Sequence, residues 1–260
     1  MKRLKDLVEW FKMQKVLITG HKGFIGKHVF ADWKETHSEW VTGLDRPDDV
    51  KDFSGGDYDL VIHLAAYADI RDSQENPEKY YENNVVSTKP LFDWCRKTNT
   101  RLLYASSSTV EEDYWTNPYA MTKWINEQMA PHNSVGMRFT TVYGPGGRGN
   151  MMYDLLKDRK ATYVTNHKRD WIHVKDVCRA IRYLAASDVT GPVPVGTGKS
   201  ISVKDLAAAF GQGNLPVQEL TPGERQDNAA DVKILTSIGW FPTTNILDTV
   251  NEYSKLATPL

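Results

Sequence analysis

The sequence has little cysteine and almost no net charge. Only two cysteines, Cys95 and Cys178, occur among the 260 residues, with no CxxC motif and no Cys/His cluster that would predict a metal site. We expect both to be reduced thiols, as in a cytoplasmic protein. The formal net charge is −1 and no long basic run is present, so nucleic acid is not an expected partner.

Long apolar runs are also missing, which argues against a membrane partner. The first 14 residues place Leu4, Leu7, Val8 and Phe11 at helical spacing. This stretch is too charged and too short for a signal peptide or a membrane span, so we expect an amphipathic extension at 1–14. Hydrophobic residues make up 40% of the chain, which is typical of a globular protein with a sizeable core.

Strand-like and helix-like segments alternate along the first half of the chain. Short apolar runs that predict buried strands are followed by stretches with helical patterns. This alternation predicts an α/β fold of the Rossmann type, a doubly wound parallel sheet with helices on both faces. The expected strands cover 15–20, 40–45, 57–66, 100–108 and 134–144, and the expected helices cover 26–35, 74–98 and 118–130.

The composition changes after Tyr143. A glycine-rich loop follows at 144–150, and the alternation weakens beyond it. We therefore predict a Rossmann domain at 15–145 and a small C-terminal lobe that makes up most of 146–260. Segments near 170–195 are expected to return to the first domain.

Three glycines lie between the first strand and the first helix, in the run GHKGFIG at 20–26. A pyrophosphate binds against backbone N–H groups at a helix N-terminus, where a Cβ atom would hold the backbone away from it. The spacing is GxxGxxG and not GxGxxG, but strand, glycines and helix come in the required order. We predict dinucleotide contacts from Gly20, Lys22, Gly23, Phe24, Ile25 and Gly26.

Asp45 lies at the end of the second expected strand. A carboxylate there can accept hydrogen bonds from both hydroxyls of the adenosine ribose, and it would repel a 2′-phosphate. Asp45 therefore favours NAD over NADP. Lys22 and Arg46 bring positive charge close to it in sequence, and they keep NADP open as the less favoured cofactor.

Tyr119 and Lys123 form a YxxxK pair, which shares one face of a helix. A lysine ammonium near a phenol favours the phenolate, and a tyrosine tuned in this way can exchange protons with a substrate hydroxyl. The strand before this helix ends in Ser106-Ser107-Ser108-Thr109, which can supply hydroxyl groups to the same place. We predict redox chemistry on a small substrate, with Tyr119 and Lys123 as the reacting pair.

These pieces, together with others along nearly the whole chain, carry a resemblance to a known family. The chain resembles extended short-chain dehydrogenases/reductases of the nucleotide-sugar epimerase/dehydratase family. The matching segments are TGHKGFIG, HLAA (63–66), NNV (83–85), YASSSTV (104–110), PYAMTK (118–123), RFTTVYGP (138–145), RDWIHVKDV (169–177) and GTGKSISV (196–203). The resemblance implies that the C-terminal lobe binds a nucleotide sugar.

The resemblance also implies a role for each matching residue. Tyr119 is expected to be the catalytic acid/base, Lys123 its partner and a ribose ligand, and Ser107 the hydroxyl that bonds the sugar 4-hydroxyl. Arg169 matches an arginine that grips the nucleotide diphosphate, which suits a guanidinium group. Further cofactor contacts are implied for Leu64, Ala65, Ala66 and Asn84.

Two comparisons within the family narrow the expected reaction. Sugar 4,6-dehydratases carry an Asp-Glu pair where this chain has Ser108 and Thr109, so dehydration is not expected. The stretch 138–152 resembles UDP-glucuronate 4-epimerases, in which a threonine and a later arginine match Thr141 and Arg148. Hydroxyl groups for a sugar carboxylate would come from Ser107, Ser108, Thr109 and Thr141.

Some features depart from the family pattern or leave alternatives open. The gap from Ser107 to Tyr119 is 12 residues, about half that of typical relatives, and Glu111-Glu112 replaces the usual Tyr-Gly. A reductase that consumes NADPH, or a dinucleotide-binding sensor without activity, would also fit the fold. The family suggests a homodimer that pairs the helices at 74–98 and 118–130, with Leu91, Trp94 and Trp124 as interface or core residues.

Overall fold

The computed structural model describes residues 14–37, 39–46, 49–219 and 224–256. The amphipathic extension expected at 1–14 therefore lies, apart from Gln14, outside the described residues. Within them, no helix is long and apolar enough to cross a membrane.

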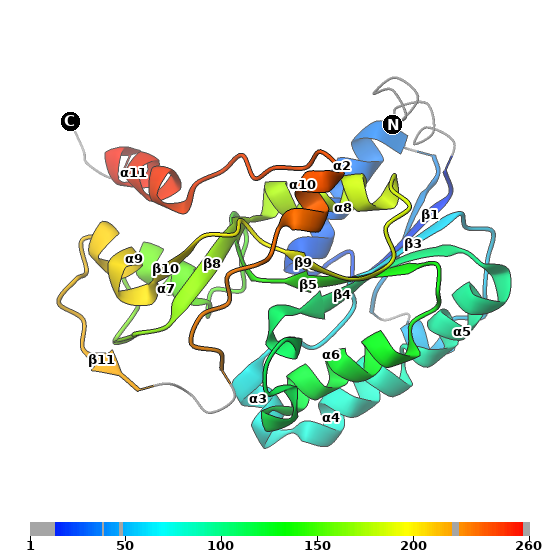
Figure 1. The fold of residues 1–260 in the computed structure, drawn as a ribbon, viewed down its shortest axis with the longest axis horizontal. Helices are drawn as coiled ribbons and strands as arrows, with labels where there is room; N and C mark the ends of the chain where they lie inside the picture. The colour runs from blue at the N-terminus through cyan, green and yellow to red at the C-terminus, as the bar shows by residue number, and fades with distance from the viewer. Residues whose placement is uncertain (1–13, 38, 47–48, 220–223, 257–260) are drawn as a thin grey trace.

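Six parallel strands form the central sheet, in the order β2-β1-β3-β4-β5-β9 (Figure 1). The chain order reverses between β1 and β3, and in such sheets ligands bind outside the carboxyl ends of the strands at this point. The Rossmann-type α/β fold expected from the alternation is confirmed. The strands are β1 (Val16–Thr19), β2 (Val41–Leu44), β3 (Leu60–His63), β4 (Arg101–Ser107), β5 (Ser134–Phe139) and β9 (Gly191–Val195).

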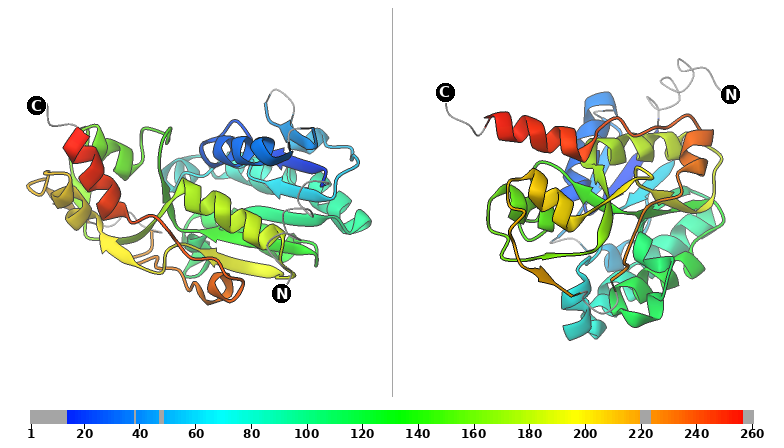
Figure 2. Two further views of the ribbon diagram at one scale, coloured as in Figure 1. Left: turned by 90° about the horizontal axis from the view of Figure 1, so that it is seen from above. Right: turned by 60° about the vertical axis from the view of Figure 1, so that its left-hand side comes forward.

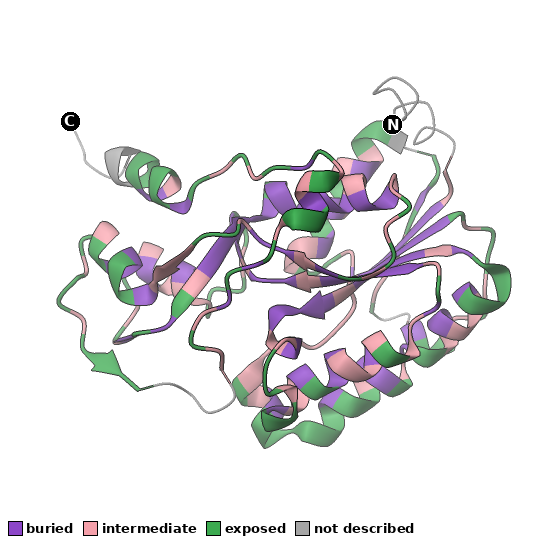
Figure 3. Cartoon of the chain, viewed as in Figure 1, coloured by how far each residue is buried: buried purple, intermediate pink, exposed green. Residues whose placement is uncertain are grey.

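Helices cover both faces of this sheet. Successive strand residues point to opposite sides, so the apolar residues of each strand form a core on each face. Figures 1 and 2 show α2 (Phe24–His37) and α8 (Val174–Ala185) on one face, with α5 (Lys89–Thr98) and α6 (Pro118–Met129) on the other. Val16 and Ile18 belong to the core on the α2 side, and Leu17 belongs to the core on the α5 side. The strands between these layers are largely buried (Figure 3).

The single long helix expected at 74–98 is wrong. The structure has α3 (Ile70–Glu75), α4 (Pro77–Tyr81), a π-helical turn η2 (Glu82–Val86) and then α5. Asn76 leaves the helical conformation with φ −130° and ψ 56°, since a residue before proline is kept out of the α region. Pro77 then starts a new helix at its first position.

The strand expected at 134–144 is also two strands. After β5 the chain leaves the central sheet at Thr140, whose N–H bonds the Val195 carbonyl. It then forms β6 (Thr141–Tyr143), which pairs with β8 (Lys168–His173), and β8 pairs with β10 (Ser200–Ser202). This small sheet carries the chain from the Rossmann layers into a second core around Tyr143, Trp171 and Leu206.

The remaining elements are short. Three helices pack against or near the second core: α7 (Met152–Lys157), α9 (Val203–Ala209) and α11 (Ile246–Leu256). The others are η1 (Val50–Asp52), η3 (Ser108–Val110), η4 (Tyr114–Thr116), β7 (Val164–Thr165), β11 (Val217–Gln218) and α10 (Lys233–Ser237).

The three residues considered for a dimer interface have partners within the chain. Leu91 is fully buried in the core on the α5 side, so it belongs to the core. Trp94 packs edge-on against Phe53. The Trp124 ring stacks on that of Tyr114, with 4.7 Å between the centroids.

Candidate active site

A cavity of about 1030 Å³ lies at the carboxyl ends of the parallel strands and extends to residues of β7, β8 and the segment around 224–228. Both the glycine turn and residues beyond 146 line it. A single cavity can therefore hold a dinucleotide in contact with a second ligand. Of the residues predicted from sequence, fifteen line it: Gly20, Gly23, Phe24, Ile25, Gly26, Leu64, Ala66, Ser107, Ser108, Thr109, Tyr119, Lys123, Thr141, Arg148 and Arg169.

The turn between β1 and α2 has no room for side chains at two of its glycines. Gly20 has φ +70°, and a Cβ atom there would lie 2.5 Å from the backbone nitrogen of Ala65. A Cβ atom on Gly26 would lie 1.9 Å from the carbonyl oxygen of Gly20. The turn is therefore folded tightly enough to present the first N–H groups of α2 to the cavity, as a pyrophosphate site needs.

Asp45 lies beside this turn and not on the wall of the cavity. Its carboxylate accepts hydrogen bonds from the backbone nitrogens of Lys22 (2.8 Å) and Arg46 (2.9 Å). The Lys22 ammonium bonds the Arg46 carbonyl at 2.7 Å, and the Arg46 guanidinium bonds the Tyr67 hydroxyl. Both cations thus have partners within the protein, while Asp45 keeps its position at the end of β2.

Ala65 and Asn84 do not line the cavity themselves, but both make hydrogen bonds close to it. The Ala65 N–H bonds the Thr19 hydroxyl at 3.3 Å. The Asn84 amide accepts from the Tyr67 N–H (2.9 Å) and donates to the Tyr67 carbonyl (3.0 Å). Asn84 is 1% exposed, so its clearest role is to hold the backbone of Tyr67, which lines the cavity. Its predicted contact with the cofactor stays a prediction.

His63, in the matching HLAA segment, is a buried neutral residue. Its ring nitrogens pair with the hydroxyls of Thr19 (2.7 Å) and Thr88 (3.2 Å). Burial, with the charge of Lys123, lowers the pKa of His63 to about 3. The ring therefore links β1, β3 and the start of α5 without charge.

Helix α6 brings Tyr119 and Lys123 to the end of β4. Asn117 caps the helix by accepting from the Ala120 N–H at 2.7 Å, and Pro118 occupies the first turn. Lys123 is 3% exposed and its ammonium donates to the Ala105 carbonyl at 2.9 Å. The side chain of Ser107, the last residue of β4, lies near enough to the Tyr119 phenol to lower its pKa. The three predicted catalytic side chains therefore converge.

Hydrogen bonds fix the direction of the Ser107 hydroxyl. Its oxygen accepts from the Thr109 hydroxyl (2.9 Å) and the Thr109 N–H (3.3 Å). A hydroxyl has one hydrogen and two acceptor positions, so the Ser107 hydrogen is left to point at Tyr119 or at a bound substrate. Thr109 thus acts on the site through Ser107.

The electrostatics differ in one respect from the sequence expectation. Burial raises the pKa of Tyr119, and the groups that oppose this are the hydrogen bond from Ser107 and the charge of Arg148. Burial, with the same Arg148 charge, lowers the pKa of Lys123 to about 7. Arg148 therefore contributes positive potential at Tyr119, which was not expected from the sequence.

Arg148 and Arg169 both line the cavity and both bond the protein backbone. Arg148 donates to the Ala68 carbonyl at 2.6 Å. Arg169 donates to the carbonyl of Arg225 (2.7 Å) and pairs with the carboxylate of Glu224 (2.9 Å). A diphosphate at Arg169 would have to share that guanidinium with Glu224 or displace it.

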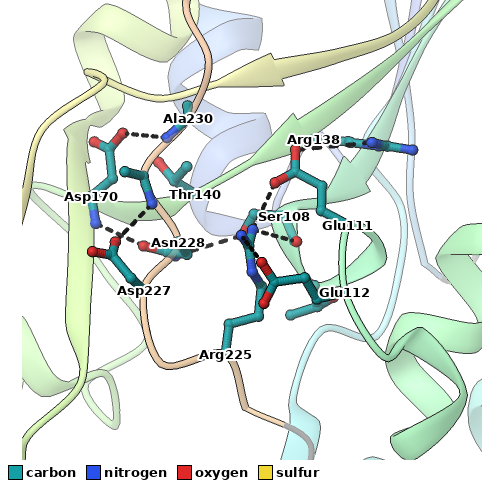
Figure 4. A network of polar contacts seen from close by, with 12 residues as sticks. Ser108, Glu111, Glu112, Arg138, Thr140, Asp170, Arg225, Asp227, Asn228 and Ala230 are labelled. Carbon is teal, nitrogen blue, oxygen red and sulfur yellow. Dashed lines mark hydrogen bonds and ion pairs between the residues drawn. The ribbon is translucent and has the colours of Figure 1, made fainter.

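Among the lining residues that the sequence reasoning missed is a group in 224–228, namely Glu224, Arg225 and Asn228. Besides Glu224, Arg225 donates to the Ser108 carbonyl (3.0 Å) and pairs with Glu111 (2.7 Å) and Glu112 (3.1 Å), as Figure 4 shows. Asn228 donates to the Thr141 hydroxyl at 3.2 Å. The shortened 107–119 segment is therefore covered by the C-terminal part of the chain. Its two unusual glutamates serve as the ion-pair partners of Arg225.

The sequence model described as "NAD dependent epimerase/dehydratase family" matches residues 16–196. The chain belongs to the NAD dependent epimerase/dehydratase family. This confirms the family resemblance, with NAD as the cofactor that the family description names.

Curated relatives and solved structures of this family agree with the assignment. UDP-glucuronate 4-epimerase 4 from Arabidopsis thaliana is 30% identical over 79% of this chain and 61% of its own length. Protein CapI from Staphylococcus aureus is 27% identical over 92% of this chain and 97% of its own length. The structure of MoeE5 in complex with UDP-glucuronic acid and NAD is 26% identical, with a TM-score of 0.79 over 94% of this chain and 100% of that one. The chain thus spans about three fifths of the length of the plant relatives it matches.

The residues present fit a bound NAD. The backbone packs so closely at Gly20 and Gly26 that no Cβ atom fits, and this tight turn brings the first N–H groups of α2 to the cavity, where a pyrophosphate would bind. Asp45 provides an acceptor at the end of β2 for ribose hydroxyls. Among the described residues, no group of three or more His, Cys, Asp or Glu side chains is arranged to hold a metal ion.

Proposed function

We propose that this protein is an NAD-dependent 4-epimerase of a UDP-sugar, and that the sugar is a uronic acid, with UDP-glucuronate and UDP-galacturonate as the interconverted pair. The observation that carries the proposal is the convergence of Ser107, Tyr119 and Lys123 in one cavity with the glycine turn. A hydroxyl, a phenol and an amine next to a nicotinamide site are the groups needed to oxidise and reduce a secondary alcohol.

Each side chain has a distinct task in this reaction. Ser107 bonds the sugar 4-hydroxyl and holds it beside the phenol of Tyr119. Tyr119 takes the proton of that hydroxyl as the alcohol becomes a ketone, and it returns the proton after the 4-keto sugar has turned its other face. A bound NAD would supply the acceptor and donor for the hydride of C4. Arg148 and the hydrogen bond from Ser107 both favour the phenolate that this sequence of steps requires.

The choice of a uronic acid is supported by the other side of the cavity. The hydroxyls of Ser108 and Thr141 and the guanidinium of Arg148 all line it, and such donors suit a carboxylate. Plant UDP-glucuronate 4-epimerases are among the relatives. MoeE5, which is 26% identical, has been solved with UDP-glucuronic acid and with UDP-glucose.

The test is to incubate the purified protein with UDP-glucuronate and to separate the products by chromatography. We expect UDP-galacturonate to form without any added reductant, because the hydride returns to the sugar in each turnover. A requirement for stoichiometric NADPH would indicate the reductase instead. Tight NAD binding with no turnover of UDP-glucuronate, UDP-glucose or UDP-galactose would indicate a binding protein without activity.

We further propose that residues 15–145, with the returning segment near 170–195, hold the cofactor, and that most of 146–260 holds the sugar nucleotide. Glu224 and Asn228, which line the cavity from the C-terminal part, support this division.

A cytoplasmic location is supported by two cysteines that are both free and buried. It can be tested by cell fractionation.

A homodimer is the proposed assembly. Large exposed apolar side chains gather on the neighbouring elements α4, η2, η4 and α6, at Tyr81, Val86, Trp115 and Met121. Trp115 is 61% exposed, and burial of such side chains favours association. Sedimentation of the wild type and of Trp115→Asp tests the proposal, since a dimer through this face would dissociate in the variant.

A further inference from the structure

Asn228 connects two hydroxyl groups that line the cavity from different strands. Its side-chain nitrogen lies 3.2 Å from the Thr141 hydroxyl of β6 and 3.5 Å from the Ser108 hydroxyl just after β4. Asn228 is 7% exposed and lines the cavity itself. Figure 4 shows its side chain reaching across from the C-terminal segment toward Ser108.

The orientation of the Asn228 amide is determined by the backbone of β8. The other polar atom of the amide, on the side away from the hydroxyls, lies 2.7 Å from the backbone nitrogen of Asp170. Because that N–H is a donor, the amide must turn its oxygen toward it and its NH₂ group toward the hydroxyls. The segment that carries Asn228 is fixed on both sides, by the bond from the Ala230 N–H to the Asp170 carboxylate (3.1 Å) and by Asp227, which accepts from the Ala229 N–H (3.0 Å).

This arrangement determines what the two hydroxyls can offer. A hydroxyl that accepts a hydrogen bond from an amide NH₂ keeps its own hydrogen for another partner. Among the described residues, neither the Ser108 nor the Thr141 hydroxyl donates within the protein, in contrast to the Thr109 hydroxyl, which donates to Ser107. Both are therefore donors toward the cavity.

We propose that Asn228 is a positioning residue that determines sugar specificity. By donating to Thr141 and Ser108, it presents two O–H donors to the substituent at C5 of the sugar and so selects a carboxylate over a hydroxymethyl group. A carboxylate only accepts hydrogen bonds, and bonds to an ionised acceptor are about twice as strong as neutral ones. This inference rests on the proposed function and names the group in the chain that sets its substrate class.

The test replaces the donor with an acceptor of the same shape. In Asn228→Asp, an oxygen faces Thr141 and Ser108 and turns their hydrogens away from the cavity. Dissociation constants for UDP-glucuronate and UDP-glucose are measured in NAD-loaded protein in the Tyr119→Phe background, so that turnover does not interfere. We expect the preference for the uronate to fall about tenfold or more, with NAD affinity unchanged.

Two further variants separate this role from a structural one. Asp227→Asn changes the neighbouring residue, whose carboxylate bonds Ala229 and Ser200 away from the hydroxyls, and we expect it to keep the preference. Asn228→Ala removes the amide without adding a charge. Asn228→Ala should lower the preference for the uronate when Thr141 is present. It should lower that preference much less in the Thr141→Val variant, which lacks the hydroxyl that Asn228 orients.

The outcomes distinguish the inference from the proposed function. An unchanged preference in both Asn228→Asp and Asn228→Ala would overturn the inference and leave the epimerase proposal standing. Equal losses of affinity for the two sugar nucleotides, or a loss of the same size in Thr141→Val, would assign Asn228 a structural role and overturn it too. Wild-type protein that binds neither sugar nucleotide would overturn the proposed function and the inference with it.

Discussion

The ammonium group of Lys123 lies 5.9 Å from the centroid of the Tyr119 ring, one helical turn away on α6. The lysine is oriented toward the Ala105 carbonyl at the end of β4, and not toward the phenol oxygen. The Ser107 hydroxyl, at the end of β4, is a neighbouring group that lowers the pKa of the phenol. Lys123 and Tyr119 thus each have a different neighbour on β4, Ala105 for the lysine and Ser107 for the tyrosine. Each can therefore be tested by its own substitution.

Replacement of Tyr119 by phenylalanine removes the proposed acid/base and little else. The ring packs against Tyr80, with 6.5 Å between the centroids, and phenylalanine keeps that contact. We expect kcat for UDP-glucuronate epimerisation to fall about a hundredfold or more, with thermal stability and NAD affinity close to wild type. A variant with full activity would exclude Tyr119 as the acid/base.

Replacement of Arg148 by methionine should move the pH dependence of kcat. The Arg148 charge opposes the rise in the pKa of Tyr119 that burial causes, so its removal lets that pKa rise further. The fraction of phenolate at a given pH then falls, and the acidic limb of the profile moves to higher pH. Arg148→Lys, which keeps a charge, should lie between the variant and the wild type. A profile that does not move would mean that Arg148 serves the substrate only.

Replacement of Lys123 by methionine should change how stability depends on pH. The pKa of Lys123 is lowered from 10.5 in the unfolded chain to about 7 in the fold. Between these values the unfolded chain binds a proton that the folded protein does not, so wild-type stability falls as the pH drops through this window. We expect the melting temperature of the variant, relative to wild type, to increase from about pH 10 to about pH 7 and then to level off. The measurement is calorimetry on NAD-free protein, and a difference independent of pH would contradict the lowered pKa.

Replacement of Asp45 by asparagine should weaken cofactor selection. The variant loses the charge that bonds the N–H groups of Lys22 and Arg46 and that would repel a 2′-phosphate. We expect NAD to bind about tenfold more weakly and the ratio of NAD to NADP affinity to fall, as measured by titration calorimetry. Asp49→Asn is the control, because Asp49 caps η1 and pairs with Lys51 and does not line the cavity. An unchanged ratio would move cofactor selection to other residues.

Much of the fold was predictable because its signals are local. The turn at 20–26 joins a strand and a helix that are adjacent in sequence, and the YxxxK pair needs only one helix. Each of these features is determined by the steric and hydrogen-bonding requirements of a short segment. Pro77 indicated the break at Asn76, but the apolar pattern continues across 74–98, since α4, η2 and α5 each contain buried residues.

The parts that were not predictable depend on contacts between distant segments. Arg225 reaches Glu111 across 114 positions, and Asn228 reaches Thr141 across 87. Nothing near 224–228 in the sequence indicates this, because the direction of a loop that returns to a site is determined by tertiary packing. The split between β5 and β6 has the same origin, since Thr140 turns away only to bond Val195 of another strand.

The carboxylate of Asp170 is fully buried, and it accepts hydrogen bonds from the N–H groups of Thr197, Gly198 and Ala230. One side chain on β8 thus holds two distant stretches of the chain, and at Ala230 it does so through the backbone N–H alone. Evolution, or an engineer, can therefore exchange the side chains next to Ala230 and retain the path of the chain. New sugar preferences can arise in this way without rebuilding the turn that holds the dinucleotide.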